Sequence, residues 1–179
     1  MKLPILAVAV LLSSTALAQS PYAGMQDRPV KALSGQQVVD LKAGRGMGLA
    51  LPAELNGYPG PSHLLELADR LNLSPSQRDS IKQLFDSMKA EAVPVGERLI
   101  EQETKLDQQF ANRTVTPDGL KIATGEIGAT QAELRNMHLK YHLETAQILS
   151  DQQMHQYAML RGYARDGGGA QHRHQQHMR

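Results

Sequence analysis

A long run of apolar residues at helical spacing constrains this chain more than any other feature. The apolar residues recur every three or four positions, a spacing that makes one face of a helix. They are Ile81, Leu84, Phe85, Met88, Ala92, Val95, Leu99, Leu106 and Phe110. Pro94 lies inside the run. Because proline lacks an amide donor and crowds the preceding turn, we expect a kink there and not the end of the helix.

A second long helix is predicted after Thr116-Pro117-Asp118, and its apolar residues wrap around more than one face. At 1.5 Å per residue, Ser74–Ala111 would be about 55 Å long and Pro117–Ile148 about 45 Å long. Two such helices joined by the short connection 112–115 pack as an antiparallel hairpin. Because the pair alone exposes too much apolar surface, we predict short helices folded over its ends and a homodimer.

Two similar motifs flank this hairpin. They read Leu73-Ser74-Pro75-Ser76-Gln77 and Leu149-Ser150-Asp151-Gln152-Gln153. Each places a serine at the N-cap and a glutamine at N3, which is the pattern of a capping box. Pro75 falls at the first helical position, where its missing donor costs nothing. The second motif predicts a last helix that ends near Tyr163.

The segment before the hairpin, residues 19–61, is predicted to be a leader with short helices. Its first part, residues 19–33, reads as flexible. Ser34 and Gln37 then form a third capping box, and Gly44 ends that helix. A small helix is expected near Met47–Leu55, followed by a break rich in proline and glycine. Ser62 is expected to cap a helix that extends to Leu71.

The first 18 residues predict export. A basic start, an apolar run of about ten residues and the close Ala16-Leu17-Ala18 are typical of a secretory signal peptide. We expect cleavage between Ala18 and Gln19, with an uncleaved anchor as the alternative. The chain has no cysteine, so helix packing and not disulfide bonding must stabilise the exported protein.

Charge and motifs exclude several functions. Without residues 1–18 the chain carries equal numbers of basic and acidic residues, so a nucleic acid partner is not expected. The glycine-rich stretch Gly44–Gly48 follows no predicted strand and precedes no Gly-Lys-Ser/Thr, so no nucleotide site is expected. There is no Gly-x-Ser-x-Gly and no His-Glu-x-x-His. We therefore expect a protein that is not an enzyme and requires no cofactor.

The paired motifs resemble the Leu-Thr-x-x-Gln motifs of the Spy/CpxP family of periplasmic stress chaperones and related heavy-metal sensors. Serine replaces threonine in both, which keeps the capping chemistry. The resemblance covers residues 62–163 and leaves 19–61 unexplained. It implies an all-α fold, a hooked four-helix hairpin that pairs as a cradle-shaped homodimer in the periplasm. It also implies an ATP-independent chaperone whose partners are unfolded proteins or an envelope sensor protein.

Client binding of this kind requires adaptable apolar side chains among charges. Four methionines on the predicted helices are candidates: Met88, Met137, Met154 and Met159. The alternative is that each is an ordinary core residue.

The sensor branch of the family implies a second function, the binding of Zn²⁺, Ni²⁺, Cu²⁺ or Co²⁺ through His, Glu and Met. His138 and His142 are four residues apart, so a helix presents both on one side. His63 is a third candidate ligand, and His155 and Glu144 are near enough to contribute. Aligning the second motif, however, puts Tyr141 and Thr145 where the sensors have His and Met. The alternative for His138 and His142 is a solvated helix face or pairing with Glu133 and Glu144.

The last residues, 164–179, are predicted to be a disordered, histidine-rich tail. Its imidazoles belong to His172, His174 and His177. Neutral imidazoles on a flexible chain bind transition metals weakly. The alternative is a tail that only favours solubility. Because the sensor ligands are not reproduced, the chaperone reading is preferred and metal binding is the alternative.

Overall fold

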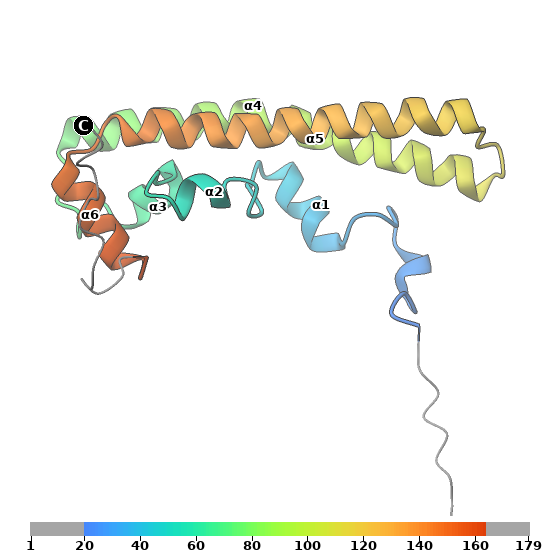
Figure 1. Cartoon of the computed structure of the whole chain (residues 1–179), viewed down its shortest axis with the longest axis horizontal. Coiled ribbons are helices and arrows are strands. Elements are labelled where there is room, and N and C mark those ends of the chain that lie inside the picture. The colour runs from blue at the N-terminus through green and yellow to red at the C-terminus, as the bar shows by residue number, and fades with distance from the viewer. Residues whose placement is uncertain (1–19, 164–179) are drawn as a thin grey trace, which may run out of the picture.

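The computed structural model describes residues 20–163, and every regular element in that range is a helix (Figure 1). The two longest, α4 (Pro75–Ala111) and α5 (Pro117–Ala146), run side by side as an antiparallel hairpin. The predicted all-α hairpin is thereby confirmed. The predicted signal peptide and histidine-rich tail lie outside the described residues.

The hairpin helices begin where their caps predict. The Ser74 hydroxyl accepts a hydrogen bond from the Gln77 amide, and the Gln77 side chain accepts one from the Ser74 amide. The Thr116 side chain accepts a bond from the Gly119 amide at the start of α5. Helix α4 continues through Pro94, as expected, whereas α5 ends at Ala146, two residues earlier than predicted.

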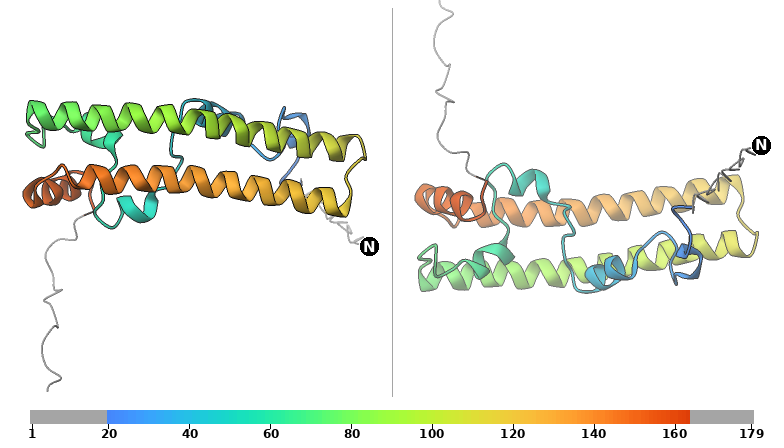
Figure 2. Two further views of the ribbon diagram at one scale, coloured as in Figure 1. Left: turned by 90° about the horizontal axis from the view of Figure 1, so that it is seen from above. Right: turned by 90° about the horizontal axis from the view of Figure 1, so that it is seen from below.

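The short helices lie along one side of the hairpin (Figures 1 and 2). In chain order they are the 3₁₀ turn η1 (Met25–Asp27), α1 (Gly35–Lys42), α2 (Leu51–Glu54) and α3 (Pro61–Glu66). Helix α6 (Asp151–Leu160) follows α5 and turns back over the same side. We call the end of the hairpin where α3 and α6 pack the hooked end, and the end at residues 112–116 the connection end.

Two of these short helices differ from the prediction. Helix α2 is shorter than Met47–Leu55 because Met47 and Gly48 adopt positive φ angles of 44° and 82°, which form a turn and not a helix. Helix α3 is capped by the Gly60 backbone, since Pro61 already occupies the first helical position. Ser62 therefore lies inside α3 and does not cap it, and α3 ends at Glu66 and not at Leu71.

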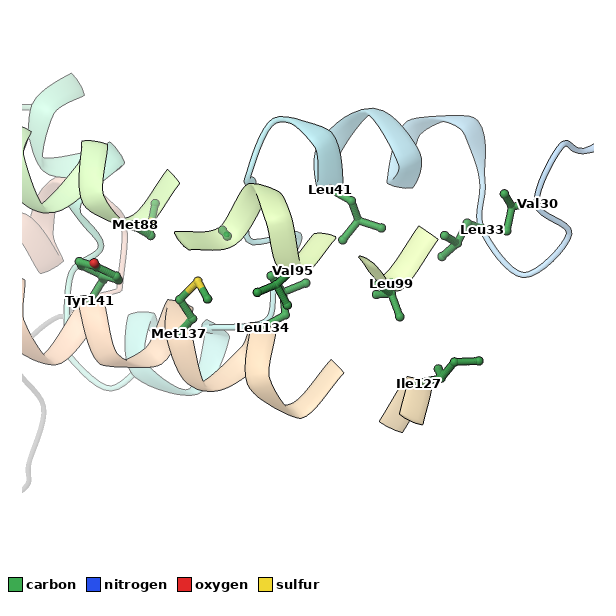
Figure 3. Close-up of a cluster of buried hydrophobic side chains, with 11 residues drawn as sticks. Val30, Leu33, Leu41, Met88, Val95, Leu99, Ile127, Leu134, Met137 and Tyr141 are labelled. Carbon is green, nitrogen blue, oxygen red and sulfur yellow. The ribbon is translucent and has the colours of Figure 1, made fainter. Parts of the chain in front are cut away.

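The leader, residues 20–60 of the described chain, packs on the hairpin. Val30 and Leu33 are 6% and 9% exposed, so the prediction that residues 19–33 are flexible is wrong for this part. Together with Leu41 of α1 they join a core that also includes Val95, Leu99, Ile127, Leu134 and Met137 (Figure 3). Val30 and Leu33 are two isolated apolar residues in a segment rich in proline and charge, too few to make a periodic pattern, so sequence patterning could not reveal their burial.

A second core lies at the hooked end. It comprises Leu64, Ala68, Leu71, Leu73, Ile81 and Tyr157. These residues come from α3, the turn after it, α4 and α6, so this core fixes the short helices to the hairpin. Within residues 20–163, no helix is long and apolar enough to cross a membrane.

Candidate functional site

The two Leu-Ser-x-x-Gln motifs meet at the hooked end. Gln77 Nε2 donates to Gln153 Oε1 at 2.9 Å, and Gln153 Nε2 donates to Gln77 Oε1 at 3.1 Å. The same two oxygens accept the N-cap amides of Ser74 and Ser150. The third capping box, at Ser34 and Gln37, pairs with no second motif. Capping alone would allow glutamate at N3. Glutamate at both positions would instead place two carboxylates in contact, so the amide pair accounts for glutamine in both motifs.

A buried carboxylate lies next to this junction. Glu54 of α2 is 5% exposed and accepts hydrogen bonds from the Tyr157 hydroxyl and, at 3.3 Å, from the Gly60 amide. Its Oε1 lies 3.4 Å from His63 Nδ1 and 3.5 Å from Arg161 Nε. Its Oε2 lies 3.8 Å from His142 Nδ1. We call these five side chains the Glu54 cluster: Glu54, His63, His142, Tyr157 and Arg161.

The surroundings of Glu54 keep it ionised. Burial alone raises the pKa of this carboxyl, but hydrogen bonds from His63 and Tyr157 outweigh burial and lower the pKa to about 2. Burial and the bond to Glu54 also raise the pKa of Tyr157. Its hydroxyl therefore stays protonated and donates a hydrogen bond to Glu54. A buried carboxylate with these partners joins α2, α3, α5 and α6.

The two histidines of α5 have different surroundings. His142 Nδ1 lies 2.6 Å from the Tyr58 carbonyl, and a carbonyl only accepts, so Nδ1 carries the proton. His138 is 3% exposed, which contradicts the alternative of a solvated face, and burial lowers its pKa. Its Nδ1 lies against Gly46, and its Nε2 has no hydrogen-bond partner within the described chain. Glu133 pairs with Arg98 and not with either histidine.

A pocket of about 500 Å³ opens beside the Glu54 cluster. The turn Ala43–Gly48 and α2 form one wall, and Phe85, Met88 and Lys89 of α4 form part of another. Glu54, His63, His138, His142 and Arg161 all contribute to its lining. The pocket is therefore partly apolar and partly polar, and three of the predicted candidate metal ligands border it.

The predicted metal ligands converge only in part. His63 and His142 approach the same carboxylate, whereas His138 packs against Gly46 and does not reach it. His155 is exposed. Among residues 20–163, no group of three or more His, Asp or Glu side chains is arranged to hold a metal ion. Tail residues His172, His174 and His177 lie outside the described residues.

Tyr141 and Thr145, the two positions that align with ligands of the metal sensors, are buried. The Tyr141 hydroxyl donates to Glu91 at 2.7 Å. Thr145 is fully buried, and its hydroxyl donates to the Tyr141 carbonyl. Neither side chain is available for another ligand.

The four candidate methionines divide between core and surface. Met88 and Met137 are 7% and 8% exposed and belong to the hairpin core, which is the alternative that the sequence left open for them. Met154 is half-buried and Met159 is 56% exposed. Other large apolar side chains are exposed instead: Tyr22, Val39, Met47, Leu51, Leu55, Tyr58, Phe110, Ile122 and Leu143.

Sequence reasoning missed three members of the Glu54 cluster. Glu54 resembles a surface acid in a short helix, Tyr157 a core aromatic and Arg161 a basic residue near a helix end. Only their distant partners reveal their role, since Glu54 and Tyr157 are 103 residues apart. No local motif could indicate this contact.

The fold and this site define an all-helical hairpin protein with a buried carboxylate at its hooked end. Comparison of the chain with protein-family models, curated proteins and solved structures found no match.

Proposed function

We propose that this protein is an exported, ATP-independent chaperone or envelope-stress protein of Spy/CpxP type, which binds unfolded proteins or an envelope sensor protein in the periplasm. The observation that carries the proposal is the pairing of Gln77 with Gln153. Two unrelated capping boxes would each serve only their own helix. Two boxes that bond to each other across the ends of one hairpin act as a single structural motif.

Exposed apolar side chains support the binding role. Met47, Leu51, Leu55 and Tyr58 are each at least 40% exposed, and they lie in α2 and in the turns on either side of it. Exposed basic side chains lie beside this group, at Lys42 and Arg45 just before it, whereas Glu54 within it is buried. Such a mixed surface binds apolar segments of many sequences weakly and reversibly.

The experiment is suppression of aggregation of a chemically unfolded client, followed by light scattering with no nucleotide present. Wild type at several-fold excess is expected to suppress aggregation. The double variant Leu51→Ser with Leu55→Ser should require several-fold more protein for the same suppression. The control is Gln83→Ser with Glu97→Ser, at two exposed polar positions. If wild type suppresses the aggregation of none of the clients tested, the proposal is refuted.

The proposal includes a cradle-shaped homodimer. Ile122 and Leu143 of α5 are 62% and 52% exposed, and burial of such residues favours association. Multi-angle light scattering at high concentration should give twice the mass of the mature chain. A monomer at every concentration would contradict the dimer.

A second candidate function is binding of Zn²⁺, Ni²⁺, Cu²⁺ or Co²⁺. The observation that favours it is that His63 and His142 both approach Glu54. Against it, Arg161 also contacts Glu54, and His142 Nδ1 is bonded to Tyr58. A metal would have to displace both contacts, which is why this function ranks second.

Calorimetric titration with each metal separates the two candidates. The variants are His63→Ala, His142→Ala, the control His155→Ala at an exposed position, and a chain truncated after Gly167. Binding tighter than tens of micromolar that is lost only in the first two variants would support a metal site in the folded domain. Loss on truncation alone would assign weak binding to the tail.

A further inference from the structure

The leader covers an apolar face of the hairpin. Val30, Leu33 and Leu41 are all buried, and Figure 3 shows them directed toward Val95 and Leu99 of α4. The view from below in Figure 2 shows the leader lying across that side of the two long helices. The face beneath the leader is therefore aliphatic, and it is filled by a segment of the same chain.

Close backbone contact fixes the leader at one point. A Cβ atom on Gly96 of α4 would lie only 2.6 Å from the Leu41 carbonyl oxygen and 3.0 Å from its carbon. These are backbone atoms of α1, so they could not turn aside as a flexible side chain can. Helix α1 approaches α4 this closely only because residue 96 is glycine.

Two polar contacts hold the leader on either side of this point. Lys31 Nζ lies 3.0 Å from Asp107 Oδ2, on the surface near the connection end. Glu54 holds α2 to the hooked end through the contacts described above. The stretch between them, residues 32–53, has no ion pair to the hairpin among the described contacts. Its docking therefore rests mainly on apolar packing.

We propose that residues 30–43 cover a second surface for apolar segments of a client, in addition to the exposed residues around α2, so that the leader competes with the client for the hairpin. This inference rests on the proposed function. The leader itself indicates the chemistry that fits: a short segment with aliphatic residues at Val30, Leu33 and Leu41 and one basic residue, Lys31, that pairs with Asp107 at the edge of the face. A client segment of similar composition could replace it and bury the same face.

The test displaces the leader without changing any apolar residue of the two long helices. Gly96→Ala places a methyl group against the Leu41 backbone and also favours the helical conformation of α4. Leu41→Asp weakens the same contact from the leader side. The control is Gly125→Ala in α5, where the new methyl group meets nothing within 4 Å.

Two readouts are made on each full-length mature variant. Trypsin cleavage after Lys31, Lys42 and Arg45 reports release of the leader, and should be at least tenfold faster in Gly96→Ala and Leu41→Asp than in wild type or the control. Suppression of client aggregation should then require several-fold less protein.

The outcomes decide between the two claims. Faster cleavage with unchanged or weaker suppression, in a protein whose wild type suppresses aggregation, would overturn the competition while leaving the proposed function intact. Unchanged cleavage in both variants would also overturn it, because the leader would not be released at this contact. Loss of all suppression in wild type and variants alike would instead refute the proposed function.

Discussion

The two halves of the hairpin differ in how they are held. The half near the hooked end carries the whole second core and contacts α3 and α6, whereas the hairpin core, with the leader on it, extends past the middle of both long helices. The half near the connection end has a more polar interior, where Gln102 Oε1 and Gln109 Oε1 are buried without a hydrogen-bond partner in the described chain. Phe110 and Ile122 at this end are more than half exposed.

Polar burial in this second half has a measurable cost. Burial raises the pKa of Glu103, and no bond to that carboxylate compensates for it among the described contacts. An unpartnered buried oxygen costs about 1–3 kcal/mol. Stability is therefore concentrated at the hooked end, so local opening should start at the connection end.

The largest expected effect contrasts one isoleucine from each half. Ile81 is fully buried at the hooked end, and Ile81→Ala should lower the free energy of unfolding by about 2–5 kcal/mol. Ile122 is 62% exposed near the connection end, and Ile122→Ala should change it by less than about 0.5 kcal/mol. Urea denaturation of both variants measures the difference. Equal losses would contradict the comparison.

A smaller effect concerns Glu54 and acid stability. Its pKa is about 2 in the folded protein against an ordinary value of 4.5, so its contribution is complete above pH 4.5 and is lost as the pH falls toward 2. A shift of this size corresponds to at most about 3 kcal/mol. Glu54→Gln should therefore show a shallower loss of stability between pH 4.5 and 2 than wild type, in urea denaturation at several pH values. The control is Glu97→Gln, at an exposed position of α4. A Glu54→Gln curve parallel to wild type would show that this carboxylate does not stabilise the hooked end.

The smallest effect compares two glutamines of α4. Gln77→Leu removes the bonds to Gln153 and to the Ile148 carbonyl, and should cost about 1–3 kcal/mol. Gln102→Leu removes an oxygen that has no partner in the described chain, so it should be neutral or stabilise the protein by up to about 1 kcal/mol. Thermal unfolding of both variants gives the sign directly. A destabilising Gln102→Leu would show that the connection end is better packed than its contacts indicate.

The sequence predicted the parts of the fold that depend on local chemistry. Ser34, Ser74 and Ser150 all cap helices with a glutamine at N3, as the sequence predicted. These caps were predictable because a capping box involves only four neighbouring residues. The passage of α4 through Pro94 and the start of α5 at Pro117 followed from the same local reasoning. Long apolar periodicity predicted the hairpin.

The features that the sequence could not predict depend on distant partners. Burial of Val30 and Leu33 required a hairpin face more than sixty positions away in the chain, and nothing in residues 19–33 indicates it. Glu54 gained its role from Tyr157 and His63 after folding. Helical spacing places His138 and His142 on one side of α5, but the two rings have different partners. His138 packs against Gly46, and His142 bonds to the Tyr58 carbonyl.

The central claim is that this protein binds clients on the hairpin face that its leader covers. Hydrogen exchange followed by mass spectrometry, on the mature protein with and without a saturating unfolded client, tests it most directly. The prediction is that amides 39–44, in the last turn of α1 and the two residues after it, exchange faster in the complex because the client has displaced the leader. Unchanged or slower exchange of these amides in a complex that has formed would contradict the claim.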